Sequence, residues 1–161
     1  QGLLVHYAVN KKNEGAPIEE LYDWLMDNRL KLCHWFTVDD LFYLKRGGRV
    51  SGAAAVMGTV LSIKPVMHVD DNGKLIPKAK VIGRKRSIEA MVDKMKETAI
   101  DPAEQTVFIS HGDCLEDAEY LANLVKTELH VKDIFIHYIE PVIGCHSGPG
   151  TLALFFMGTH R

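Results

Sequence analysis

The stretch Ile143–Gly150 constrains the fold most, because it places three glycines within eight residues, between two apolar runs. The runs are Ile134–Ile139 and Thr151–Met157, and both have the composition of buried strands. Glycine loses more conformational freedom on folding than any other residue, so this density indicates positive φ angles or a close approach to another group. We therefore expect a tight loop between two strands. Its backbone N–H groups, His146 and Ser147 either bind an anion or form an ordinary turn with an incidental histidine.

The length and charge favour a single α/β domain and argue against several functions. A chain of 161 residues fits one domain with a sizeable core. The net charge of −2 gives no support for nucleic-acid binding, and no apolar run has the length of a transmembrane segment. Cys33, Cys114 and Cys145 lie far apart, as reduced cytoplasmic thiols do, and we expect no metal and no cofactor. No initiator methionine precedes Gln1 and no signal-like segment follows it, so we expect a fragment or a processed chain.

Residue patterns predict the elements of the first fifty residues. β-branched and aromatic residues favour strands, whereas apolar residues at helical spacing favour helices. A threonine before two aspartates is typical of a helix start, and a Gly-Gly pair is typical of a helix end. The expected elements are strands at Leu3–Val9 and Cys33–Val38, a turn over Asn10–Ala16, a helix over Ile18–Leu30, and a helix from Val38 to Gly47 capped by Thr37, with Leu41, Phe42 and Leu44 on its buried side.

The segment Val50–Ile63 consists almost entirely of apolar and small residues. Such a helix is either close-packed in the core or lines an apolar cavity whose occupant supplies the missing bulk. The sequence leaves both interpretations open.

The second half of the chain predicts a hairpin followed by β-α-β alternation. The pair Asn72-Gly73 between two strand-like runs is a strong hairpin signal. Helical spacing of apolar residues then alternates with short buried runs, which favours an α/β fold with a mixed, partly antiparallel sheet and helices packed against it. The expected elements are strands at Pro65–Val69, Leu75–Ile82, Thr106–Ser110, Ile134–Ile139 and Thr151–Met157, with helices at Ser87–Thr98 and Leu115–Leu129.

Two polar clusters lie beside these elements. Arg84, Lys85 and Arg86 form a local basic group, which is either solvated surface or a docking patch for an acidic partner or a phosphate. His111 and Asp113 follow a predicted strand, where α/β proteins often place sites, although a histidine satisfied by local contacts is the simpler interpretation.

An enzymatic mechanism would use Cys145 or Ser147 as the nucleophile. His146 would be the base, with Asp113 or Glu140 to orient it, but adjacent residues of an extended segment project to opposite sides. His111 is a more distant candidate base that nothing in the sequence selects. A metal site formed by His111, Asp113 and His146 has suitable ligand types but no diagnostic spacing.

A binding function requires fewer coincidences. A carboxylate or phosphate head group would contact His146, the amides of the glycine loop and an arginine such as Arg49. An apolar tail would lie along the small-residue segment, where each buried methylene contributes about 0.8 kcal/mol. This is the leading hypothesis, and the hydrolase or transferase is the alternative.

Four motifs occur in order along the sequence: Trp35–Leu41, Tyr43–Ser51, Ile63–Pro65 and Gly144–Gly150. Together they resemble one known family, the DegV family of bacterial fatty-acid-binding proteins, over about Leu3 to Gly158. The resemblance implies a carrier that holds one fatty acid and presents its carboxylate to a separate fatty-acid kinase, without being the catalyst.

The same resemblance implies roles for individual residues and a domain boundary. His146 and Arg49 are expected near the acyl carboxylate, together with Ser147 and Gly144 of the same loop, and Arg84 or Arg86 on the surface that meets the kinase. Family members carry an N-terminal α/β domain that is missing here. Residues 1–36 are therefore expected to lead from that domain, and residues 37–161 to form the C-terminal domain. Cys145 stands where a serine is usual.

Overall fold

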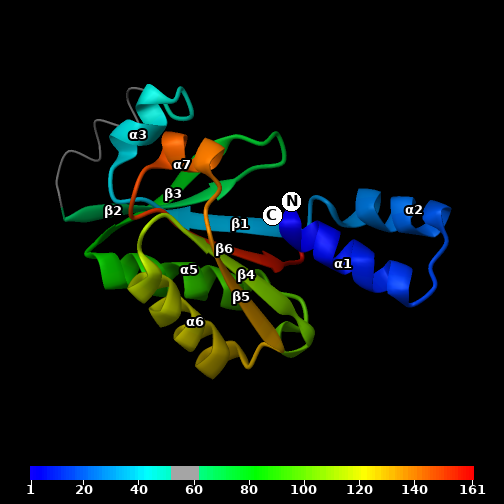
Figure 1. The fold of residues 1–161 in the computed structure, drawn as a ribbon. Coiled ribbons are helices and arrows are strands. Elements are labelled where there is room, and N and C mark those ends of the chain that lie inside the picture. The colour runs from blue at the N-terminus through cyan, green and yellow to red at the C-terminus, as the bar shows by residue number, and fades with distance from the viewer. Residues whose placement is uncertain (52–61) are drawn as a thin grey trace.

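The computed structural model describes residues 1–51 and 62–161, and its centre is a six-stranded sheet (Figure 1). The strand order is β3-β2-β1-β6-β4-β5. The elements are α1 (Gly2–Asn13), α2 (Ile18–Asn28), β1 (Leu32–Thr37), α3 (Leu41–Arg46), β2 (Ile63–Val69), β3 (Leu75–Ile82), α5 (Arg84–Thr98), the 3-10 turn η1 (Pro102–Glu104), β4 (Thr106–His111), α6 (Leu115–Leu129), β5 (Asp133–Tyr138), α7 (Pro141–Ser147) and β6 (Leu152–Met157).

The sheet is mixed, which confirms the predicted fold class. β4 and β5 are parallel and are joined through α6, as a parallel pair requires a crossover connection. The other neighbours are antiparallel, including the β2–β3 hairpin predicted from Asn72-Gly73. β1 lies between β2 and β6, so residues 32–36 belong to the same sheet as the rest of the chain. The boundary expected between residues 36 and 37 falls inside this strand.

Helices α5 and α6 lie side by side against one face of the sheet and enclose the main core (Figure 1). Their apolar residues recur at the predicted helical spacing. The predicted inward residues of α5 are all buried, which confirms this helix, although it begins at Arg84 and not at Ser87. The buried residues are Ile88, Met91, Val92 and Met95 of α5, and Ala118, Leu121, Val125 and Leu129 of α6.

The short helices α3 and α7 contact each other above the opposite face (Figure 1). A second, smaller core lies beneath them and includes Leu41 and Leu44 of α3, with Phe36 of β1 and Met67 of β2. The two helices α3 and α7, which lie about a hundred residues apart in the sequence, thus form a layer on this face of the sheet. The candidate site lies in this layer.

Helices α1 and α2 form a pair that projects from the side of the sheet (Figure 1). α1 is attached through Tyr7, whose hydroxyl donates to the Thr106 carbonyl at 3.3 Å and accepts from the Thr106 N–H at 3.2 Å. An apolar hollow of about 330 Å³ lies between the two helices. Several of their apolar side chains are exposed, namely Val5, Val9, Ile18, Tyr22 and Met26.

The strand predicted at Leu3–Val9 is wrong, because these residues lie in α1. The β-branched and aromatic residues of this segment favour a strand, but tertiary contacts override that propensity and stabilise a helix. Leu3 is buried and Tyr7, four residues later, bonds to β4, so both anchors project from the same side of a helix. The turn predicted from Asn10 begins only after Asn13.

The predicted start of α3 is also wrong. Asp40, and not Thr37, is the N-cap, and its Oδ1 accepts from the Phe42 N–H at 2.8 Å. Thr37 is the last residue of β1, so the chain is still extended where the helix was expected. Leu41 and Leu44 are buried as predicted, whereas the prediction for Phe42 is wrong, because it is 38% exposed. Its end at Gly47 is confirmed, whereas the helix predicted over Val50–Ile63 lies almost wholly outside the described residues.

Candidate functional site

The stretch predicted as a loop between strands is mostly the helix α7, so the expected extended loop is wrong. Pro141 occupies the first helical turn, where its missing N–H is not needed, and the helix continues to Ser147. Only the last part is a tight turn, with positive φ of 79° at Gly148 and 75° at Gly150. Glycine adopts a positive φ more readily than any other residue, which explains why residues 148 and 150 are glycines.

The glycine amides of this stretch do not form the expected anion-binding nest. The N–H of Gly144 donates to the Glu140 carbonyl at 2.9 Å, and the N–H of Gly148 donates to the Gly144 carbonyl at 2.8 Å. The N–H of Gly150 donates to the Gly112 carbonyl at 2.7 Å. All three donors are used inside the protein, so an anion at this place must be bound by side chains.

Ser147 is likewise engaged within α7. Its side chain is 4% exposed, and its hydroxyl donates to the Ile143 carbonyl at 3.0 Å. This bond one turn back along the helix uses its only proton. Ser147 therefore supports the end of α7 and has no proton left to donate to a carboxylate.

Arg49 and His146 both contact Gly47, the residue that ends α3. Arg49 is exposed, and its Nη1 donates to the Gly47 carbonyl at 2.6 Å. The partly buried imidazole of His146 packs on Gly47, where an added Cβ would overlap Nδ1 and lie 3.1 Å from Cγ. The absence of a side chain at residue 47 thus makes room for the imidazole, while the carbonyl of the same residue accepts from the guanidinium.

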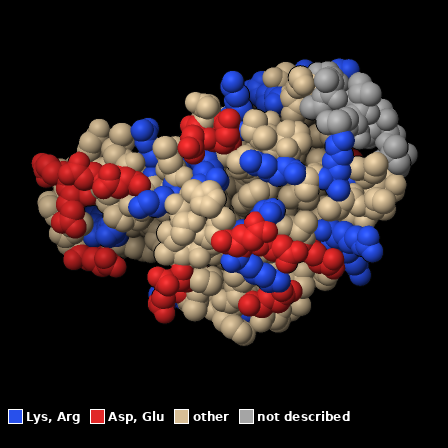
Figure 2. All heavy atoms as spheres, turned by 180° about the vertical axis from the view of Figure 1, so that it is seen from behind, with Lys and Arg blue, Asp and Glu red and all other residues tan. Residues whose placement is uncertain are grey.

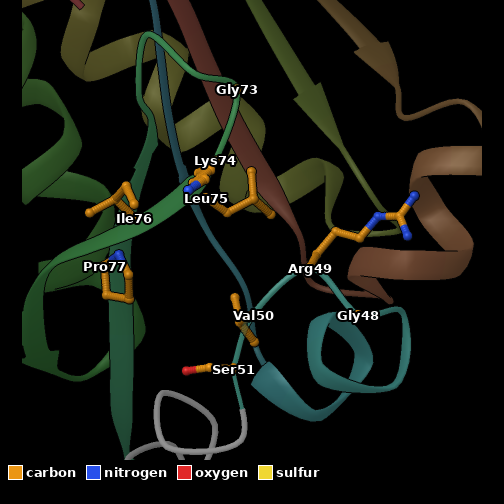
Figure 3. Close-up of a pocket in the computed structure, with 9 residues that line it drawn as sticks. All are labelled: Gly48, Arg49, Val50, Ser51, Gly73, Lys74, Leu75, Ile76 and Pro77. Carbon is orange, nitrogen blue, oxygen red and sulfur yellow. The ribbon is translucent and has the colours of Figure 1, made fainter.

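A hollow of about 540 Å³ lies beside Arg49. In Figure 3, the Arg49 side chain extends towards α7, away from the β3 residues that form the opposite wall. That wall is partly apolar, with Leu75, Ile76 and Pro77. The structure therefore places a cation at the edge of a concave surface with apolar walls, which suits an amphipathic molecule. The lining residues are Gly48–Ser51 and Gly73–Pro77.

Arg84 and Arg86, the two predicted docking residues, have different surroundings. Arg84 is held inside the structure: its Nε contacts Asp117 Oδ2 at 2.8 Å, and its Nη1 lies 3.7 Å from Asp39 Oδ1. Its side chain is only 18% exposed. Arg86 is exposed. Basic and acidic side chains of the described residues are interspersed over the face seen in Figure 2.

His111 is satisfied by local contacts. It is 2% exposed, its Nδ1 accepts from the Cys114 N–H at 3.3 Å, and its ring packs on Tyr138 with centroids 4.4 Å apart. Within residues 1–51 and 62–161, no three His, Cys, Asp or Glu side chains are placed to hold a metal ion. Burial raises the pKa of the Cys114 thiol, which disfavours its reactive thiolate. Cys145 is exposed at the surface of α7.

Sequence reasoning missed the role of Gly47, which it treated only as a helix end. The available signal was the Gly-Gly pair itself, because a single glycine suffices to end a helix. Gly48 has a φ of +70° and open space around it, so it makes the turn, whereas Gly47 has a helical φ of −74° and admits the imidazole.

The fold and site define a class of α/β protein in which a short C-terminal helix with one histidine packs on a Gly-Gly-Arg segment beside a mixed sheet. A model of the DegV family of uncharacterised proteins matches residues 1–159. The chain belongs to the DegV family. None of the described helices is long and apolar enough to cross a membrane.

The chain spans about half the length of the relatives that it matches. A DegV domain-containing protein of Clostridium perfringens is 52% identical over 158 residues, which are 98% of this chain and 54% of that protein. The structure of a DegV lipid-binding protein from Thermotoga maritima superposes with a TM-score of 0.84 at 31% identity, covering 99% of this chain and 55% of the other. A fatty-acid-binding DegV protein from Streptococcus agalactiae has a TM-score of 0.81 at 29% identity, covering 96% and 54%.

Proposed function

We propose that this chain is part of a fatty-acid carrier and provides the side chains that bind the carboxylate. The observation that carries the proposal is the convergence of Arg49 and His146 on Gly47. Similarity to structures described as lipid-binding and fatty-acid-binding supports it. A guanidinium and an imidazole beside each other offer several N–H donors to one carboxylate, and bonds to a charged acceptor are the stronger kind.

The acyl chain is proposed to lie in the hollow beside Arg49. With about 540 Å³, this hollow has the size of a small-molecule site. Each methylene transferred there from water contributes about 0.8 kcal/mol, so the apolar tail provides most of the affinity and the two cationic or polar groups fix its direction. The hollow is open on this chain, so full enclosure of the ligand requires further protein.

We propose the helix pair α1–α2 as the contact with that further protein. The relatives are nearly twice as long as this chain, and the exposed apolar side chains of α1 and α2 surround an apolar hollow. Burial of this surface against the rest of a full-length protein would remove it from water. Under this proposal α1 and α2 form the connecting segment, whereas β1 (Leu32–Thr37) belongs to the sheet of the C-terminal domain, so the boundary lies before residue 32 and not at residue 36.

The proposed role is that of a bacterial cytoplasmic carrier without its own catalytic activity, which presents the carboxylate to a fatty-acid kinase. Among the predicted docking residues, Arg86 is favoured because it is exposed, whereas both carboxylate partners of Arg84 belong to this chain. An exposed arginine is free to pair with an acidic surface and to accelerate association.

The test is ligand retention by the full-length protein. The protein is purified from bacteria, denatured and extracted, and the extract is analysed for fatty acids by mass spectrometry. We expect one fatty acid per protein, and re-binding of oleate after delipidation. Arg49→Ala and His146→Ala should weaken re-binding about tenfold each, the typical loss for a charged hydrogen bond.

Arg86→Ala is the matched control, because it removes an exposed guanidinium from the proposed docking surface and should leave oleate affinity unchanged. The proposal fails if the wild-type protein contains no fatty acid and binds none after delipidation. It also fails if Arg49→Ala and His146→Ala retain wild-type affinity.

A further inference from the structure

Two further glycines are in close contact with side chains from the region of α3. A Cβ added at Gly148 would lie 2.6 Å from Cγ and Cδ2 of the Tyr43 ring. A Cβ added at Gly150 would overlap the carboxylate of Asp39 and lie 2.8 Å from its Cβ. Both distances are far below van der Waals contact, so each side chain packs directly on a glycine backbone. With the contact already described, the three pairs are Asp39 on Gly150, Tyr43 on Gly148, and His146 on Gly47.

These pairs form one regular, antiparallel interface. Tyr43 and Gly47 are four residues apart and lie on one side of α3, whereas Asp39 precedes its N-cap. Their partners are spaced by two residues along the end of α7 and the turn that follows. One partner of each pair is a glycine, so the other partner's side chain packs directly on its backbone.

Asp39 connects this interface to the body of the domain. Its carboxylate Oδ1 lies 2.9 Å from Lys64 Nζ of β2 and 3.7 Å from Arg84 Nη1 of α5. The side chains of Lys64 and Arg84 are only 14% and 18% exposed, so these cations have little access to water. Loss of the Asp39 charge would leave them with one carboxylate fewer, which favours a change in the position of residue 39.

The turn is also fixed from the side of the sheet. The N–H of Gly112, at the end of β4, donates to the Thr151 carbonyl at 2.8 Å. The hydroxyl of Thr151 donates to the Gly148 carbonyl at 2.7 Å. These bonds tie the turn to the sheet, and His146 lies only two residues before Gly148, so we expect a displacement at Gly148 or Gly150 to change the position of the imidazole.

We infer that Asp39 and Tyr43 are positioning residues that set the place of the His146 imidazole relative to Arg49. The inference rests on the proposed carboxylate site and adds to it the elements that fix its geometry. Neither residue touches the proposed ligand. Tyr43 acts through the flat ring on Gly148, and Asp39 acts through its charge and its contact with Gly150.

The test records NMR spectra of the His146 ring in ligand-free full-length protein labelled with ¹³C,¹⁵N-histidine. The His146 resonances are assigned by their loss in His146→Asn. Tyr43→Leu and Asp39→Asn should shift these resonances and weaken oleate binding about tenfold, within the range of effects between contacting residues. Tyr43→Phe keeps the ring and should retain wild-type resonances and affinity. Asp71→Asn removes an exposed carboxylate of the β2–β3 hairpin and is the charge control.

The outcomes separate this inference from the proposed function. Wild-type His146 resonances and wild-type affinity in both Tyr43→Leu and Asp39→Asn would overturn the positioning role. If the resonances shift as expected but the wild-type protein binds no fatty acid, the positioning role stands and the proposed ligand is wrong. Should Tyr43→Leu fail to fold, Asp39→Asn decides the matter alone, since it changes a charge at nearly constant volume.

Discussion

Alanine at residue 47 should separate the stability of the protein from the geometry of its site. Gly47 has φ −74° and ψ −3°, a conformation that alanine adopts without strain. The added methyl group would overlap Nδ1 of His146, so the ring must move by about 1 Å to reach ordinary contact. The substitution therefore displaces the imidazole while it leaves the backbone of α3 in an allowed conformation.

The expected change in the free energy of unfolding is small. Replacement of glycine at a compatible position stabilises by about 0.4–1 kcal/mol through the unfolded chain. Overpacking costs about 1–3 kcal/mol, and the lower part of this range applies because the partly buried ring of His146 has room to turn outwards. We expect a net loss of about 1 kcal/mol or less, with a loss in fatty-acid affinity of about tenfold or more if one donor is displaced.

Gly15→Ala is the matched control, because Gly15 has φ +97°, no atoms within 4 Å of an added Cβ, and a place between α1 and α2 outside the hollow beside Arg49. The positive φ costs alanine about 1–2 kcal/mol, but nothing pushes on His146. Urea unfolding should therefore show Gly15→Ala as the less stable variant, whereas oleate titration should show Gly47→Ala as the weaker binder. Wild-type oleate affinity in Gly47→Ala, or an equal loss of affinity in both variants, would refute the reasoning.

Three further predictions concern the rest of the chain. Burial lowers the pKa of His34 to about 4, so the unfolded state binds more protons below its ordinary pKa of 6.5, and up to about 3 kcal/mol of stability should be lost as the pH falls from 6.5 to 4. Urea unfolding at pH 7 and pH 4.5 should show a smaller difference for His34→Gln, and an unchanged difference would contradict this assignment. Asp40→Ala removes the N-cap of α3 and should cost about 1 kcal/mol, whereas Met95→Ala in the main core should cost about 2–5 kcal/mol, both measured by urea unfolding; equal losses would be inconsistent with the burial described. Iodoacetamide should modify exposed Cys145 first and Cys33 last, because burial raises the pKa of Cys33 to about 11, and mass spectrometry of peptides gives the order. Rapid labelling of Cys145 by an ester-type activity probe, which a carrier has no reason to show, would instead favour the hydrolase alternative.

The parts of the fold that were predictable are those encoded by local patterns. In α5, Ile88, Met91, Val92 and Met95 repeat at helical spacing, and Asn72-Gly73 specifies a hairpin within a few residues. In α1, by contrast, Leu3 is buried and Tyr7 bonds to Thr106 of β4, 99 residues later in the sequence, which no local window contains. The predicted start of α3 is wrong for a related reason. Thr37 is a suitable N-cap residue by type, but it pairs with Leu152 in the sheet and therefore stays extended.

The sequence predicts the residues of the candidate site better than their surroundings. His146 and Arg49, which lie about a hundred residues apart in the sequence, both contact Gly47, while their role in ligand binding stays a prediction. Ser147 and the amide of Gly144 looked equally suitable in the sequence, yet both donate inside α7. A helix was not expected there, because glycine has a low helix propensity, and only the contacts with α3 and the position of Pro141 make a short helix favourable.

The glycines of the candidate site differ from those of anion-binding glycine loops in how their backbone N–H groups are used. Glycine-rich loops that bind anions do so with free backbone N–H groups, whereas here the N–H groups of Gly144, Gly148 and Gly150 are all bonded within the protein. Under the proposed function, a carboxylate would therefore be bound by side chains, and binding would depend on the relative position of Arg49 and His146. That position is proposed to depend on the approach of α3 and α7, which the absence of side chains at residues 47, 148 and 150 permits. A methyl group at any of the three positions should therefore act on binding through geometry, even though none of them would contact the ligand.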